Sequence, residues 1–104
     1  RGDEIIPISS KEIALVGLDD GQVYIRSLSG KRYSVSQNIE QLASILGSNF
    51  YRLNRQFIIN HQCIKRVSYY FDRKLIAHPT FEFQEKLFVS KAKSRDFLKW
   101  LESH

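Results

Sequence analysis

The segment 52–56 holds four polar or basic residues, at positions 52, 54, 55 and 56, and lies between apolar residues on both sides. In the segment 50–60, which reads Phe-Tyr-Arg-Leu-Asn-Arg-Gln-Phe-Ile-Ile-Asn, the apolar residues predict an anchor in the core. We expect that anchor to hold Arg55 and Asn54 outward on a short, stiff platform. A guanidinium and an amide fixed at a surface suit a set pattern of acceptors, such as base edges or phosphates. The segment is therefore a candidate contact for nucleic acid.

Two further polar groups fall at predicted turns or element starts. The sequence Asp19-Asp20-Gly21-Gln22 forms the tip of a predicted hairpin, because Asp and Gly tolerate the positive φ that such turns need. Ser90-Lys91, followed by Lys93 and Arg95, opens the last predicted helix. Residues at turns and helix starts are held by rigid neighbours, so these groups are also candidate binding residues.

The positive charge of the chain is concentrated in its second half. Residues 1–49 hold five Lys or Arg against six Asp or Glu, or −1, whereas residues 50–104 hold eleven against five, or +6. A net charge of +5 with this distribution suits a polyanionic partner, and nucleic acid comes first. A basic surface that only aids solubility is the alternative.

Length and composition predict one ordinary globular domain. The chain has 104 residues, of which 42% are hydrophobic, including seven Phe, five Tyr and one Trp. Cys63 is the single cysteine, so no internal disulfide forms, and its apolar neighbours predict a packed, reduced thiol in a cytoplasmic protein. The sequence contains neither an apolar run long enough to span a membrane nor a signal-peptide pattern. The start Arg-Gly-Asp-Glu, without an initiator Met, leads us to expect a fragment of a longer protein, with residues 1–4 as linker.

Alternating and helical patterns predict a mainly-β domain. Apolar residues at positions 39, 42, 43 and 46 follow one face of a helix, which Ser36 could cap and Gly47 could end. A final helix is expected from about residue 91 to 102, with Ser90 as its cap. Many short strands with few helices favour a sandwich of small antiparallel sheets. The expected strands are residues 12–18, 22–28, 32–35, 64–71, 74–78 and 87–89, with at most an edge strand at 5–8.

Residues 50–60 resemble the central motif of the LytTR DNA-binding domains, which are output modules of many bacterial response regulators. That motif is an aromatic, an Arg, a His or Asn, an Arg or Asn, a small polar residue, an aromatic, two aliphatics and an Asn. Val89-Ser90-Lys91 is similar to the family's Val-Ser-Arg near its C-terminal helix. The predicted elements follow the family's order, so the resemblance covers essentially residues 1–104 as a single domain.

The resemblance implies an elongated stack of antiparallel sheets whose loops, and not a recognition helix, enter the major groove of double-stranded DNA. Arg55 would read a base in one groove and Lys91, in place of the usual Arg, a base in the next. Gln22 would be a third base contact, with Asn54 beside Arg55. Side-chain chemistry agrees, because Arg and Lys suit guanine and Gln suits adenine. The expected phosphate contacts are Arg52, Gln56, Ser90 and Lys93.

The resemblance also implies a wider context. The domain would regulate transcription as the output half of a two-component response regulator, with an upstream receiver or sensor domain in the same chain. Two copies would bind repeated half-sites as a dimer. No cofactor is implied. The sequence departs from the family at Gln56, where Ser is usual, at Asn54, where His is commoner, and at Lys91.

Other interpretations of the same residues stay open. Arg55 and Lys91 could be ordinary solvated charges, and Arg52 could be a structural ion-pair partner. The whole domain could be a protein-interaction or sensory module that binds through its sheet edges, with exposed apolar patches. It could also bind single-stranded nucleic acid through Tyr69 and Tyr70, which requires both rings at the surface.

Catalytic and metal sites find no support in the sequence. Asp19 and Asp20 are adjacent on a predicted turn and are expected to be turn formers and not an acid pair. The three histidines are scattered, with no second ligand at metal spacing, so no zinc site is expected. We therefore predict no catalytic residue and no metal ligand.

Overall fold

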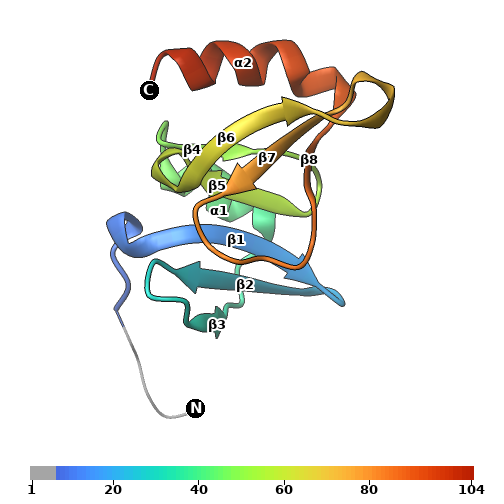
Figure 1. Cartoon of the computed structure of the whole chain (residues 1–104). Coiled ribbons are helices and arrows are strands. Elements are labelled where there is room, and N and C mark those ends of the chain that lie inside the picture. Colours follow the sequence, from blue (N-terminus) through green and yellow to red (C-terminus); the bar gives the residue numbers. More distant parts are fainter. Residues whose placement is uncertain (1–6) are drawn as a thin grey trace.

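The structure is a computed structural model that describes residues 7–104. The expected linker, residues 1–4, lies outside the described residues, as does the first half of the expected edge strand at 5–8. Residues 7 and 8 are described and form no strand. The described chain builds two antiparallel sheets and two α-helices (Figure 1). The predicted mainly-β sandwich with a short helix and a C-terminal helix is confirmed.

The larger sheet has five strands in the order β3-β2-β1-β5-β4. Its first hairpin closes at Asp19 and Gln22, which are paired across the turn. Asp20 and Gly21 between them have φ of 53° and 80°, the left-handed region that the Asp-Asp-Gly sequence predicts. The strands are β1 (Ile13–Asp19), β2 (Gln22–Ser27), β3 (Arg32–Ser34), β4 (Phe50–Arg52) and β5 (Phe57–Asn60).

The helix α1 (Ile39–Leu46) covers one face of this sheet, as the spacing of its apolar residues predicts. Its cap is Asn38 and not Ser36, so that prediction is wrong by two positions. Asn38 and Gln41 form a reciprocal capping box, with each side chain accepting from the other's backbone N–H, and this satisfies two otherwise unpaired donors. Gly47 ends the helix with φ of 90°, as predicted.

The smaller sheet has three strands, β6 (Ile64–Tyr69), β7 (Leu75–Pro79) and β8 (Leu87–Val89). The first of them is shorter than the predicted strand 64–71. The chain leaves the sheet at Tyr70 and turns through Asp72 and Arg73, both of which have positive φ. The residues at the end of the predicted strand, including Phe71, therefore belong to a turn.

The C-terminal helix α2 (Ser94–Glu102) follows a short 3-10 helix (Lys91–Lys93), so the predicted helix 91–102 is two elements. Ser90 precedes the 3-10 helix, but its side chain makes no capping hydrogen bond, and its predicted role as a cap is wrong. Phe97 is fully buried and fixes α2 on the core.

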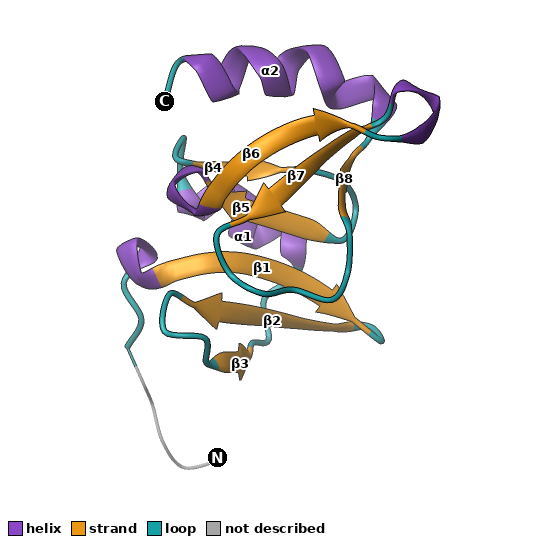
Figure 2. Cartoon of the chain, viewed as in Figure 1, coloured by secondary structure: helices purple, strands orange, loops and turns teal. Residues whose placement is uncertain are grey.

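Alternation along the strands divides the interior into two layers. On β5, Phe57 and Ile59 face the smaller sheet and α2, whereas Ile58 between them faces α1. On β2, Tyr24 faces the smaller sheet, and its ring lies where a Cβ on Gly17 would come within 2.4 Å. Figure 2 shows α1 on one side of the five-stranded sheet, and the smaller sheet with α2 beside it on the other side. The loops at the ends of the strands carry the candidate site.

Candidate nucleic-acid interface

The side chain of Asn54 is turned inward and shapes the loop between β4 and β5. Its Oδ1 accepts hydrogen bonds from the backbone N–H groups of Gln56 at 2.7 Å and Phe57 at 3.1 Å. Its Nδ2 donates to the carbonyl oxygen of Phe88 in β8. The prediction that Asn54 stands outward beside Arg55 is wrong, because backbone groups of the loop and of β8 already use both ends of its amide.

Arg52 braces the same loop from beneath. Its Nε donates to the carbonyl oxygen of Asn54 at 2.9 Å, and its Nη2 donates to that of Arg55 at 2.8 Å. Its Nη1 lies 3.4 Å from a carboxylate oxygen of Glu40 in α1, and only 19% of its side chain is exposed. The alternative that Arg52 is a structural ion-pair partner is therefore confirmed, and its guanidinium is not free for a phosphate.

Gln56 and Lys93 also make intramolecular contacts that tie neighbouring elements together. The Nε2 of Gln56 donates to the carbonyl oxygen of Leu18 at the end of β1, at 3.3 Å. The Nζ of Lys93 donates to the carbonyl oxygen of Arg52 at 3.0 Å. Burial and the nearby Arg52 guanidinium lower the pKa of Lys93, against the opposing effect of Asp96. Both side chains hold the loop in place instead of extending from it.

Arg55 and Lys91 are the two predicted base contacts that project from the surface. Arg55 is exposed, and its side chain forms no hydrogen bond or ion pair with any residue from 7 to 104. The Nζ of Lys91 lies 3.5 Å from Oδ2 of Asp72, with 69% and 72% of the two side chains exposed. A pair this exposed is worth about 0–1 kcal/mol and gives way readily to a stronger anion.

The loops that carry Arg55 and Lys91 adjoin each other. The N–H of Ser90 donates to the carbonyl oxygen of Leu53 at 2.9 Å, which joins the start of one loop to the start of the other. The bonds from Asn54 to β8 and from Lys93 to β4 strengthen this junction. In Figure 1 both loops lie at the same end of the molecule. The two loops that carry these cations are therefore joined within one scaffold.

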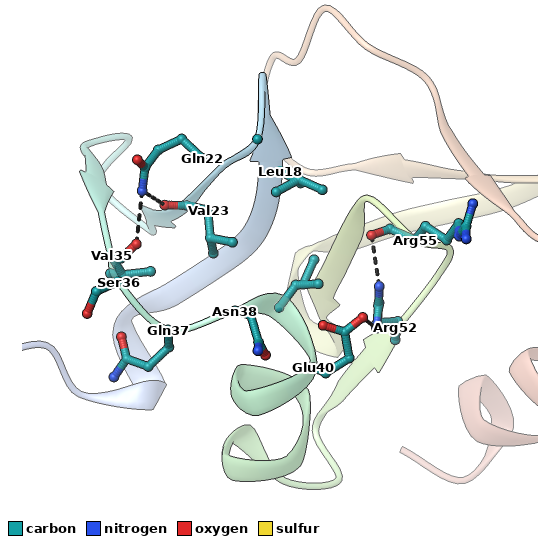
Figure 3. Close-up of a pocket in the computed structure, with 12 residues that line it drawn as sticks. Leu18, Gln22, Val23, Val35, Ser36, Gln37, Asn38, Glu40, Arg52 and Arg55 are labelled. Atoms are coloured by element: carbon teal, nitrogen blue, oxygen red, sulfur yellow. Dashed lines mark hydrogen bonds and ion pairs between the residues drawn. The ribbon is translucent and has the colours of Figure 1, made fainter.

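Gln22 begins β2 at the hairpin turn, and its side-chain amide already forms hydrogen bonds within the protein. Its Nε2 donates to the carbonyl oxygens of Val35 at 2.9 Å and Val23 at 3.2 Å. Gln22 and Arg55 line the same open hollow between the hairpin tip, the start of α1 and the β4–β5 loop. Figure 3 shows Arg55 pointing out of this hollow and Gln22 bent toward Val35. The side chain of Gln22 would have to rotate to read a base.

Three structural partners of the site were missed from the sequence. Glu40 pairs with Arg52, Asp72 lies beside Lys91, and the Phe88 carbonyl receives the Asn54 amide. All three belong to segments that are distant in the chain from their partners. No local sequence pattern predicts these contacts. Ser90, a predicted phosphate contact, lies at the junction and is half-buried, and its backbone N–H is already used.

Tyr51 on β4 joins this site to α2. Its Oη donates to Oδ2 of Asp96 at 2.7 Å, and its ring packs on Phe97 and Trp100 with centroids 5.2 and 5.0 Å away. Burial, the hydrogen bond and the charge of Asp96 raise the pKa of the Tyr51 phenol well above its usual range. The folded protein therefore keeps this phenol protonated at pH values where an unfolded chain loses the proton, near pH 10.

We expect Tyr51→Phe to lower the free energy of unfolding by about 1 kcal/mol at pH 7, through the lost hydrogen bond. The wild type should lose stability above about pH 10, because only the unfolded phenol ionises there. The variant should lose less over the same range. Urea unfolding from pH 7 to 11 checks both effects, and equal slopes in the two proteins would contradict the linkage.

Other candidate sites are accounted for within residues 7–104. Cys63 is buried and unpaired, and burial raises the pKa of its thiol, as a packed residue requires. Among these residues no cluster of His, Cys, Asp and Glu side chains could hold a metal ion. None of the helices described here has the length and apolar character needed to cross a bilayer.

The structure is thus a mainly-β scaffold with an exposed arginine and an exposed lysine on two joined loops. The model of the LytTr DNA-binding domain family matches residues 3–102, and the chain belongs to that family. The family resemblance suggested by residues 50–60 is thereby confirmed. DNA binding in the regulation of transcription is the function class of the family.

Two known proteins are similar to this chain. It is 29% identical over 72 residues to the sensory transduction protein LytT of Bacillus subtilis (strain 168), an alignment that covers 68% of this chain and 30% of LytT. The chain thus spans less than a third of that relative. A solved LytTr DNA-binding domain from Bacillus cereus superposes with a TM-score of 0.80 at 20% identity, over 97% of this chain and 91% of that one. At this identity the match supports the fold alone.

Proposed function

We propose that the chain binds double-stranded DNA in a sequence-specific way through loops that enter the major groove. One observation carries the proposal: Arg55 and Lys91 are exposed on two loops that a backbone hydrogen bond joins at 2.9 Å. A planar guanidinium on a rigid loop suits the O6 and N7 acceptors of guanine. The ammonium of Lys91 approaches the same acceptors with less geometric selectivity.

The remaining polar residues divide into two groups in this proposal. Ser90, at the junction, and the exposed cations of the second half contact phosphates and set the register of the protein on DNA. Arg52, Asn54, Gln56 and Lys93 act indirectly, because their hydrogen bonds hold the two loops in shape. Gln22 is a third base contact if its amide rotates away from Val35.

We infer that the domain is the output part of a cytoplasmic two-component response regulator, preceded in the same chain by a receiver or sensor domain. LytT is named a sensory transduction protein, and its length beyond the aligned part leaves room for such a domain. A dimer on repeated half-sites would double the number of phosphate contacts. It would also raise affinity through effective concentration.

The test is binding to duplex DNA enriched from a random pool, measured by fluorescence anisotropy between 50 and 200 mM salt. We expect enrichment of a defined sequence. The logarithm of the affinity should fall linearly with the logarithm of salt concentration, with a slope of about −0.9 per neutralised phosphate. Failure to enrich any sequence, even with the domain fused as a dimer, would contradict the proposal.

A second candidate, single-stranded nucleic-acid binding, is favoured by one observation. The side chains of Tyr69 and Tyr70 are 66% and 44% exposed, as that interpretation requires. Arg55 and Lys91, however, lie on the other loops, and the tyrosines form no continuous stacking row, since the ring of Tyr70 packs edge-on against Phe88. Competition decides between them: a single strand of the enriched sequence should displace the duplex poorly.

A further inference from the structure

The turn between β6 and β7 carries the most exposed aromatic residue of the described chain. Phe71 is 83% exposed, and Tyr69 and Tyr70 precede it at the end of β6. None of the interactions described above for the DNA-reading loops uses these rings. Three successive exposed aromatic residues make this turn a candidate place for another molecule to bind.

The backbone of this turn holds Phe71 outward in an uncommon conformation. Asp72 and Arg73 have φ of 62° and 58°, in the left-handed region, without a glycine at either position. The N–H of Tyr70 donates to the carbonyl oxygen of Lys74 at 2.6 Å, which closes the turn. Strain of this type is often found where a side chain must be presented for binding.

Cations lie near the two tyrosines that precede Phe71. The guanidinium of Arg73 lies 6.0 Å from the ring centre of Tyr69, and the ammonium of Lys86 lies 5.9 Å from that of Tyr70. Beside them, a shallow groove is lined by Tyr69, Arg73, Lys91, Arg95 and Leu98, with Asp72 as its carboxylate. An apolar tip within a cationic surface fits a polyanion that also offers apolar edges, and deoxyribose–phosphate is such a surface.

The turn also lies directly beside the proposed base-contacting loop. The 3.5 Å ion pair between Asp72 and Lys91 joins the two segments. Figure 1 shows the β6–β7 turn next to the connection that leads into α2. If Lys91 enters a groove of a DNA duplex, the next part of that duplex would lie against Phe71.

We propose that the β6–β7 turn is a further DNA-contacting element that reads the flank of the site. Phe71 packs against the sugar edges of the minor groove next to the base pair at Lys91, and Arg73 and Arg95 neutralise phosphates on either side. This inference rests on the proposed function and extends the footprint beyond the bases that Arg55 and Lys91 read.

The test compares duplexes of the enriched core with and without a flanking extension at the end where Lys91 binds. That end is identified as the base position at which Lys91→Ala relaxes the preference.

Wild-type affinity should rise about tenfold on extension, and Phe71→Ala should lose this gain while binding the short core as the wild type does. Arg73→Gln should lower the salt slope by about one on the long duplex only. Leu28→Ala is the matched control. Leu28 is an exposed apolar residue, at 52%, and lies in the turn that follows the C-terminal end of β2.

The outcomes separate this inference from the function on which it rests. Equal affinities of Phe71→Ala and wild type on every duplex would overturn the inference and leave the turn as a protein-docking surface. A protein that binds no duplex at all would overturn the proposed function, and the inference with it. Equal loss on the short and long duplexes would also overturn it, because Phe71 would then act on the core site.

Discussion

Asn54→Ala should lower the free energy of unfolding by about 2–3 kcal/mol and weaken DNA binding about tenfold. The Asn54 side chain makes three hydrogen bonds, two as acceptor from the backbone of its own loop and one as donor to the carbonyl of Phe88. A hydrogen bond of this kind contributes about 1 kcal/mol, and its loss leaves backbone groups without partners. The β4–β5 loop would then lose its fixed shape, and Arg55 its orientation. Urea unfolding and anisotropy titration measure the two effects.

Asn54→Asp is the matched control, because it keeps the acceptor for the N–H groups of Gln56 and Phe57 but removes the donor toward Phe88. We expect it to lose about half the stability that Asn54→Ala loses. If instead Asn54→Ala keeps wild-type stability and selectively relaxes one base position, Asn54 contacts a base directly and the inward assignment is wrong.

Phe97→Ala should cost about 3–5 kcal/mol of stability, the range for removing a buried aromatic ring. Phe97 is fully buried, and its ring contacts those of Tyr51 and Trp100 with centroids 5.2 and 5.8 Å away. The cavity would open between α2 and β4, and α2 directly follows the 3-10 helix that contains Lys91. We therefore expect Phe97→Ala to weaken DNA binding as well as to lower the free energy of unfolding.

Phe97→Leu should cost less than Phe97→Ala, because most of the ring volume is replaced. Thermal unfolding followed by circular dichroism compares the two variants. A cost below about 1 kcal/mol for Phe97→Ala would show that α2 is not anchored by this ring.

Much of the fold is predictable because its signals are local. The alternation of Phe57, Ile58 and Ile59 identifies a strand with two buried faces, and Asp20-Gly21 identifies a hairpin turn. The cap of α1 was misplaced because Ser36 and Asn38 are both good capping residues. Only Asn38 has a Gln three positions later to complete the capping box.

The candidate site also has a part that local sequence signals predict and a part that they do not. Arg55 and Lys91 could be chosen from motif and charge, and both are exposed in the structure. The roles of Arg52, Asn54 and Lys93 could not be chosen, since each also has a partner in another element, 12, 34 and 41 residues away in the chain. A polar side chain near a binding loop looks the same in sequence whether it contacts the ligand or holds the loop.

The most direct test of this account is selection from random duplex DNA with the wild type, Arg55→Ala, Lys91→Ala and the control Lys11→Ala. Lys11 is an exposed cation just before the start of β1, whereas the hairpin turn lies at the other end of that strand. We predict that Arg55→Ala and Lys91→Ala each relax the preference at one base position, with a loss of discrimination of about 1–3 kcal/mol there, and that Lys11→Ala changes none. Uniform weakening at every position in both variants would contradict base reading by these two residues and reduce them to phosphate contacts.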